Sequence, residues 1–126
     1  MKKAIHPAGI PPAIAPYSPA IQVGNWIYVS GQLPVDSSTG ALIQDDMKAA
    51  ALLILKNIEC ILDSADAGKL DIVKTTVYLT DMADFPEVNK AYAAFFVEPY
   101  PARVCVQVAG LPKNARIEID AIAYRE

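Results

Sequence analysis

Five short stretches of the chain carry the hydrophobic pattern of β-strands. Three of them alternate apolar and polar side chains with a period of two, and the first two are apolar runs joined by Gly24-Asn25, which suits a hairpin turn. The stretches are residues 20–23, 26–30, 72–80, 101–108 and 117–123. The connection at residues 109–115 is short enough for the last two strands to form a second antiparallel hairpin.

Two further segments have the spacing of amphipathic helices, with apolar residues recurring at steps of three and four. The first covers residues 44–65, and Asp45 or Asp46 supplies its N-cap. The second begins at Asp84-Phe85-Pro86-Glu87, which has the pattern of a capping box with proline in the first turn, and it ends before Pro99. The element order therefore predicts hairpin, helix, strand, helix and hairpin.

The length and the element order predict one α+β domain over residues 1–126, in which one sheet is covered by two helices. Hydrophobic residues make up 53% of the sequence and charged residues only 20%. This apolar content exceeds what the core of one small domain hides, so self-association is expected.

Charge and cysteine content exclude several classes of partner. The net charge is -3, the pI is near 5.1, and no basic run is longer than Lys2-Lys3, so nucleic acid is not an expected partner. No stretch has the apolar length of a signal peptide or a membrane span, which predicts a cytoplasmic protein with reduced thiols. Cys60 is expected to be buried beside the apolar stripe of the first helix. The two cysteines and His6 lack metal-ligand spacing, and no glycine-rich phosphate loop occurs, so we expect no metal and no dinucleotide or triphosphate cofactor.

The strand at 101–108 carries a cation and a thiol on one face. Alternation places Arg103 and Cys105 together and predicts that the valines between them, at 104, 106 and 108, face the core. The strand at 117–123 presents Glu118 and Asp120 on a shared face. Loop length does not fix the register between these strands, so a structural ion pair between Arg103 and Glu118 is as well supported as a functional pair.

Polar residues elsewhere have two interpretations each. The first nineteen residues contain five prolines and predict an extended arm or a loose tail, in which Tyr17 serves as a surface anchor or a site residue. Ser30-Gly31-Gln32 either permits close approach of a ligand or simply ends a strand. Asn89 occupies the second turn of the second helix, where a solvated position is the default.

The chemistry that remains is binding of a small carboxylate together with proton transfer. His6 lies in the proline-rich start, which disfavours a nucleophile activated by histidine. Arg103 can form a bidentate fork with a carboxylate, and Glu118 or Asp120 can move a proton or position a water. Hydroxyl groups from Tyr17 and Ser30 could complete such a site.

The motifs of the chain resemble those of the RidA/YjgF family of reactive-intermediate deaminases, and the resemblance extends over nearly the whole length. The matching segments are Pro101-Ala102-Arg103, Cys105-Val106, Leu111-Pro112-Lys113, Ile117-Glu118-Ile119, Ala15-Pro16-Tyr17-Ser18, Gly24-Asn25, Val29-Ser30-Gly31-Gln32-Leu33-Pro34, Ile72-Val73-Lys74-Thr75-Thr76-Val77, and Phe85 with Val88-Asn89. The resemblance implies a chorismate-mutase-like two-layer sandwich with a mixed sheet. It also implies a homotrimer with a barrel-like core and ligand clefts between neighbouring subunits.

The same resemblance implies cofactor-independent hydrolysis of 2-imino acids, such as 2-iminobutanoate and 2-iminopropanoate, to 2-oxo acids and ammonia, which protects pyridoxal-phosphate enzymes. In this reaction Arg103 would clamp the substrate carboxylate and Glu118 would orient or activate the attacking water. The cleft would be lined by Tyr17, Ser30, Gly31, Gln32, Asn89 and Cys105, the last as a wall rather than a nucleophile.

Two departures from the family pattern affect what the resemblance implies. Val104 stands where many members have Ser or Thr, but alternation turns it away from Arg103. The segment at residues 97–100 that leads to Pro101 is short, which affects the size of the pocket and the range of substrates. The alternative function is a non-catalytic trimeric protein that binds small carboxylates in the same cleft. A ribonuclease activity ascribed to some relatives is disfavoured by the acidic balance and the lack of a basic aromatic patch.

Overall fold

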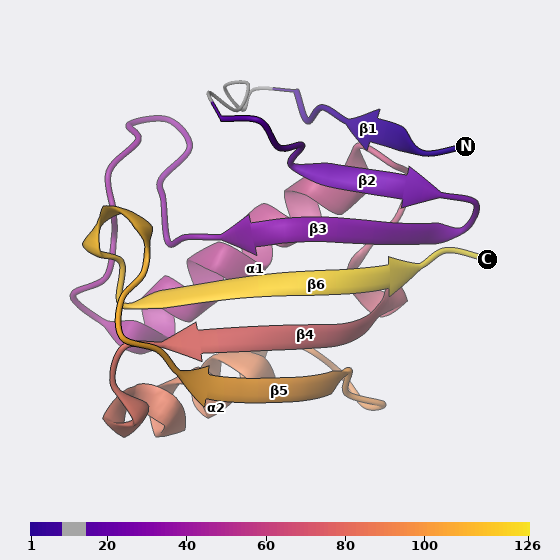
Figure 1. The fold of residues 1–126 in the computed structure, drawn as a ribbon. Coiled ribbons are helices and arrows are strands. Elements are labelled where there is room, and N and C mark those ends of the chain that lie inside the picture. Colours follow the sequence, from indigo (N-terminus) through magenta and orange to yellow (C-terminus); the bar gives the residue numbers. More distant parts are fainter. Residues whose placement is uncertain (9–14) are drawn as a thin grey trace.

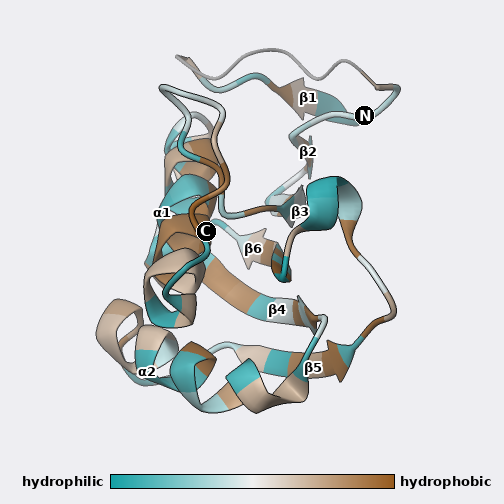
Figure 2. Ribbon diagram, turned by 90° about the vertical axis from the view of Figure 1, so that its left-hand side faces the viewer, coloured by the Kyte–Doolittle hydropathy of each residue, from teal (hydrophilic) through white to brown (hydrophobic). Residues whose placement is uncertain are grey.

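The computed structural model describes residues 1–8 and 15–126, which form a six-stranded mixed sheet and two helices (Figure 1). The strands are β1 (Lys3–Ile5), β2 (Ala20–Val23), β3 (Trp26–Gln32), β4 (Ile72–Leu79), β5 (Ala102–Gln107) and β6 (Ile117–Tyr124). The helices are α1 (Met47–Asp63) and α2 (Phe85–Phe95). Both pack on one side of the sheet and leave its other side open (Figure 2). The predicted two-layer α+β fold is confirmed.

The helix ends match the sequence pattern at one helix and not at the other. Asp46 caps α1, because its carboxylate accepts hydrogen bonds from the backbone N–H groups of residues 48 and 49. The capping box predicted at Asp84 is wrong, since Asp84 makes no side-chain capping bond. Its carboxylate instead pairs with Arg116 at 3.0 Å, which ties the start of α2 to the start of β6.

The order of strands across the sheet is β1-β2-β3-β6-β4-β5, and this order corrects one prediction. The hairpin of β2 and β3 forms as expected, with Gly24 at φ +57° in its turn. The second hairpin does not form, because β6 lies between β3 and β4 and is antiparallel to both, while β5 pairs in parallel with β4. The connection from β5 to β6 passes the end of β4, where the N–H of Val108 donates to the carbonyl of Leu79.

The core lies between the helices and one face of the sheet. On β6 the predicted alternation is confirmed, since Ile117 and Ile119 are fully buried beneath the helices and Glu118 points to the opposite side. On β5 the predicted face is wrong. Val104 and Val106 are 43% and 39% exposed, whereas Arg103 turns toward α2 and Cys105 packs against the core. Alternation settles which residues share a face, but pairing with β4 settles which face meets the helices.

The open face of the sheet is unusually apolar for a surface in contact with water. Trp26 and Tyr28 on β3 are 43% and 48% exposed, and the two valines of β5 lie on the same face. Ile122 on β6 lies between these two groups, opposite Tyr28 in the register. Lys74 and Thr76 of β4 lie between Ile122 and the two valines, so the face carries two apolar groups, and large exposed apolar side chains gathered on one face are typical of a protein interface.

Three other expectations concern the rest of the chain. The extended arm is confirmed in part, because β1 pairs with β2; the segment 9–14 of that arm lies outside the described residues. Cys60 is exposed, so its predicted burial is wrong. Among the described residues no helix is long and apolar enough to cross a membrane, and no group of three or more His, Cys, Asp and Glu side chains could hold a metal ion.

Candidate functional site

Arg103 occupies the helix-facing side of β5 and is held there by two aromatic rings of α2. Its guanidinium carbon lies 4.8 Å from the centroid of the Tyr92 ring and 5.0 Å from that of Phe85. Cation–π contact of this kind fixes the direction of a guanidinium without neutralising its charge. Within the described part of the chain Arg103 forms no ion pair, so its fork of donors is available to an anion.

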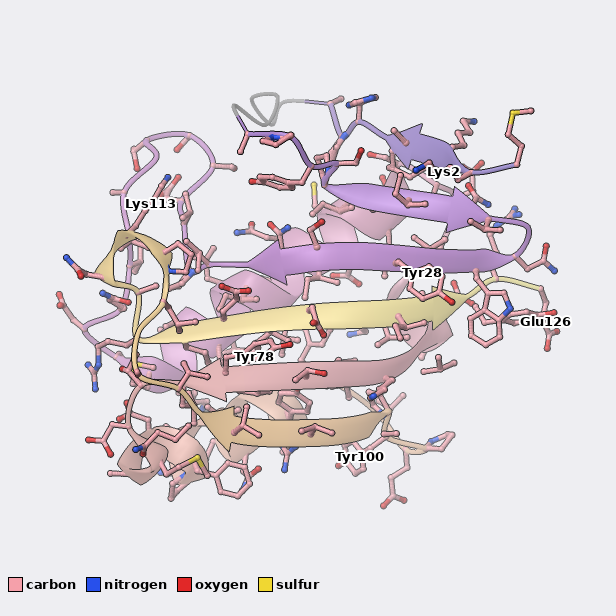
Figure 3. All side chains as sticks on the ribbon, in the orientation of Figure 1. Lys2, Tyr28, Tyr78, Tyr100, Lys113 and Glu126 are labelled. Atoms are coloured by element: carbon pink, nitrogen blue, oxygen red, sulfur yellow. The ribbon has the colours of Figure 1, made fainter. Side chains whose placement is uncertain are left out.

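A hollow of about 420 Å³ opens beside Arg103. It is lined by Asn89, Tyr92, Ala93, Tyr100, Pro101 and Arg103. Figure 3 shows Tyr100 beside the start of β5, the edge strand of the sheet. Polar groups therefore converge with a fixed cation on a hollow of the size that suits a small molecule.

Two groups next to Arg103 remain protonated. Burial raises the pKa of Tyr92 to about 12, and its hydroxyl bonds the buried Thr75 hydroxyl at 2.6 Å. Burial also raises the pKa of the Cys105 thiol, an effect that Arg103 partly opposes. Because the thiolate is the nucleophilic form of cysteine, Cys105 is poorly suited to act as a nucleophile.

Glu118 lies on the open face of the sheet, opposite Tyr78 in the register of β6 and β4. A β-bulge in β3 brings the backbone of Gly31 against the Glu118 carboxyl group, so a Cβ atom at position 31 would overlap it. Burial raises the pKa of Glu118, and the nearby charge of Asp120 raises it further. Glu118 is thus a half-buried carboxyl group that holds its proton more readily than an ordinary glutamate.

Asp120 sits beside Glu118 on the same face and is anchored by β4. Its two carboxylate oxygens accept hydrogen bonds at 3.2 Å, one from the backbone N–H of Thr76 and one from the hydroxyl of Tyr78. Burial and the charge of Asp120 raise the pKa of Tyr78. Figure 3 shows Tyr78 and Tyr28 on the face turned away from the helices.

The end of the proline-rich arm lies against the bulged end of β3. The Ser30 hydroxyl donates to the carbonyl of Ser18 at 2.6 Å, and the Ser30 N–H donates to the carbonyl of Pro19 at 2.9 Å. Tyr17 precedes this anchor and is 58% exposed. Gln32 donates to the carbonyl of Ser30 at 3.0 Å. Tyr17 and Ser30, the two predicted site residues that carry a hydroxyl group, are thus tied together through Ser18.

The predicted site residues form two groups on opposite faces of one chain. Arg103 and Asn89 line the helix-facing hollow, and Cys105 lies on the same face of β5, packed against the core, while Glu118 and Gly31 belong to the open face. The ion pair between Arg103 and Glu118 within one chain does not form, because β4 separates their strands and their side chains point in opposite directions.

Sequence reasoning missed the roles of two tyrosines. Tyr92 stacks on Arg103, and its position three residues after Asn89 places both on one side of α2, which is a signal that the sequence contained. Tyr78 anchors Asp120, but the register of β4 and β6 that brings them together follows from the insertion of β6. No local pattern gave that register.

The sequence and the fold of this chain are similar to those of known proteins. Residues 8–125 match the family model described as Endoribonuclease L-PSP. The chain is 46% identical over 128 residues to the 2-iminobutanoate/2-iminopropanoate deaminase of Salmonella typhimurium, covering 99% of each protein. Two similar crystal structures have a TM-score of 0.91. RidA from an Antarctic Psychrobacter is 43% identical, covering 97% of this chain and 98% of that one. Escherichia coli TdcF with bound serine is 42% identical, covering 98% and 99%.

Proposed function

The chain belongs to the RidA/YjgF family, and from this premise we propose that it hydrolyses small 2-imino acids to 2-oxo acids and ammonia. The observation that carries the proposal is Arg103, a guanidinium held by two rings beside a hollow and without an ion-pair partner in the described part of the chain. Such a fork suits the substrate carboxylate, which every 2-imino acid carries. The serine bound to Escherichia coli TdcF, an amino acid of similar size, supports the same ligand class.

We further propose that the site is completed by two neighbouring subunits of a homotrimer. The Arg103 group and the Glu118 group lie on opposite faces of one chain, so a substrate held by Arg103 needs Glu118 from another chain. The apolar open face, which includes Trp26 and Tyr28, supports such an assembly because subunit contact removes it from water. The cleft would then lie where β5 of one subunit meets the Glu118 surface of the next.

In the proposed reaction Glu118 handles the proton of the attacking water. With the imine nitrogen already protonated, the carboxylate accepts a proton as the water oxygen bonds to the imine carbon and the electron pair of the C=N bond moves to nitrogen, which gives a neutral amino alcohol. Glu118 then gives its proton to the nitrogen, the C–N bond breaks as the hydroxyl oxygen forms the C=O bond, and the hydroxyl proton passes to the departing ammonia, so the products are ammonium and the 2-oxo acid. Arg103 orients the substrate throughout, while Cys105 stays a thiol and forms no covalent bond.

The remaining predicted residues would shape the cleft. Tyr17, Ser30 and Gly31 lie near Glu118 or on the arm tied to that end of β3, so they would line the side where water approaches. Asn89 lines the Arg103 hollow, where its amide can bond the substrate. Gln32 bonds the backbone of Ser30 and would support that strand end.

A coupled assay tests the proposal. A threonine dehydratase supplies 2-iminobutanoate, and the release of ammonia or 2-oxobutanoate is followed with and without the protein. We expect acceleration by the wild-type protein and background rates with Arg103→Ala. Binding of 2-oxobutanoate without any acceleration would instead identify the protein as a carboxylate-binding member of the family.

A further inference from the structure

Asp120 and Glu118 form a pair of carboxyl groups in which each member has different surroundings. They are two residues apart on one strand, so both side chains stand on the open face of the sheet. Asp120 accepts two hydrogen bonds from β4, one per oxygen. Within the described part of the chain no hydrogen bond reaches the Glu118 carboxyl group, which lies against Gly31. The donors of this surface are thus directed to one carboxyl group of the two.

The register shows that this division is built into the sheet. Tyr78 is the residue directly opposite Glu118, yet its hydroxyl reaches along the strand to Asp120. Thr76, directly opposite Asp120, adds the second donor through its backbone N–H. Two donors suit an ionised carboxylate, which accepts hydrogen bonds and donates none. Asp120 is therefore the natural carrier of the negative charge of the pair.

We propose that Asp120 is a positioning residue that holds a fixed negative charge beside Glu118, so that Glu118 keeps a proton available for the leaving nitrogen; this inference rests on the proposed imine hydrolysis. Two titratable neighbours that differ in environment divide acid and base roles in this way. Burial and the charge of Asp120 raise the pKa of Glu118, in agreement with the geometry.

In the described part of the chain, the other groups that face Glu118 do not supply a fixed negative charge. From β4 the facing titratable group is Tyr78, whose pKa is raised by burial and by Asp120, so it remains a neutral phenol. From β3 the contact is the uncharged backbone of Gly31. Lys74, the next charged residue on the open face of β4, pairs with Ile122 and so lies beyond Asp120 as seen from Glu118. In the proposed assembly the neighbouring subunit adds Arg103, whose positive charge pairs with the substrate carboxylate.

Imine hydrolysis needs a carboxyl group that can both accept and release a proton. Imine hydrolysis requires one group that accepts a proton when water attacks and returns it when ammonia leaves. A glutamate held by strong donors would accept the proton poorly, because hydrogen bonds to the charged form favour that form. Directing those donors to Asp120 leaves Glu118 able to exchange its proton in both directions.

The test compares Asp120→Asn, which removes the charge but keeps the shape, with Asp120→Glu, which restores the charge. In protein labelled with ¹³C at glutamate carboxyl groups, the Glu118 signal, assigned with Glu118→Gln, is titrated by NMR. We expect its midpoint to move to lower pH in D120N and to return toward the wild-type value in D120E. The pH dependence of kcat should follow the same order, and kcat of D120N at neutral pH should fall about 3- to 10-fold, less than the loss of the acid–base group itself.

The two readouts separate this inference from the proposed function. An unchanged Glu118 midpoint in D120N, with both variants folded and assembled, overturns the role of Asp120 even if the wild-type protein is an efficient deaminase. A shifted midpoint in a protein that does not accelerate imine hydrolysis overturns the proposed function and the catalytic purpose of the pair. Equal losses of kcat in D120N and D120E, without a shift in either pH profile, would reduce Asp120 to a structural residue.

Discussion

Replacing Gly31 with alanine tests whether the position of the Glu118 carboxyl group controls the reaction. A Cβ atom at position 31 would lie 2.7 Å from Cδ of Glu118, whereas ordinary contact begins at 3.4 Å. The carboxyl carbon must therefore retreat by about 0.7 Å, since a methyl group fixed to the backbone cannot move. Displacement of a reacting group by about 1 Å can cost about 100-fold in rate, so we expect kcat of G31A to fall roughly 10- to 100-fold.

The fold should survive the same substitution. The atoms that the new methyl group meets belong to the end of a flexible side chain, and Gly31 does not have the positive φ that only glycine tolerates well. The free energy of unfolding should therefore change by less than about 1 kcal/mol. KM should change little, because the substrate carboxylate is held by Arg103, and Gly31 does not line the Arg103 hollow.

Gly110→Ala is the matched control, because a Cβ atom at position 110 meets no atom within 4 Å. Both variants are assayed for kcat and KM with enzymatically generated 2-iminobutanoate, and their melting temperatures are measured. G110A should match the wild-type protein in every measurement. If G31A also retains wild-type kcat, the placement of Glu118 beside Gly31 has no part in the reaction and the reasoning is refuted.

Three further substitutions test separate parts of the structure. Arg103→Lys keeps the charge but loses the fork, so KM should rise about 10- to 100-fold in initial-rate measurements, and an unchanged KM would contradict bidentate binding. Val106→Asp places a charge on the open face and should yield monomers without activity by sedimentation analysis, whereas a wild-type mass would count against that face as the interface. The pKa of Tyr92 is about 12 against 10.0 for an ordinary tyrosine, so the unfolded chain releases this proton first and stability should fall by roughly 2–3 kcal/mol as pH rises from 10 to 12. Tyr92→Phe should flatten that part of the pH dependence in denaturant titrations, and an equal slope in both proteins would rule out Tyr92 as its source.

Local patterns predicted most elements of the fold, because each depends on nearby residues. Gly24-Asn25 indicated the first hairpin, and the apolar spacing after Asp46 indicated α1. The order of strands depends on contacts far apart in the sequence, and here the short connection at 109–115 favoured the wrong arrangement. It spans one strand instead of making a hairpin, because β6 pairs with both β3 and β4.

The site shows the same division between local and distant information. Alternation predicted that Arg103 and Cys105 share a face, and this is confirmed. The valines between them were predicted to lie in the core because they are apolar, but in one chain they are exposed on the open face. A sequence pattern cannot distinguish a residue buried by its own helices from one suited to burial by another subunit, since both are equally apolar.

The position of Arg103 and Glu118 on opposite faces makes the number of chains per site an experimental question. Arg103→Ala and Glu118→Gln are each expected to be inactive as pure proteins. If the site takes Arg103 from one subunit and Glu118 from its neighbour, mixed trimers contain some sites in which both intact residues meet. Random assembly of equal amounts gives each site about a one-in-four chance of this pairing, so about a quarter of the wild-type rate should return after the two proteins are unfolded and refolded together. Refolding each variant alone is the control. If the mixture stays inactive while mass analysis shows mixed trimers, the two residues do not act across subunits, and the proposed cleft is wrong.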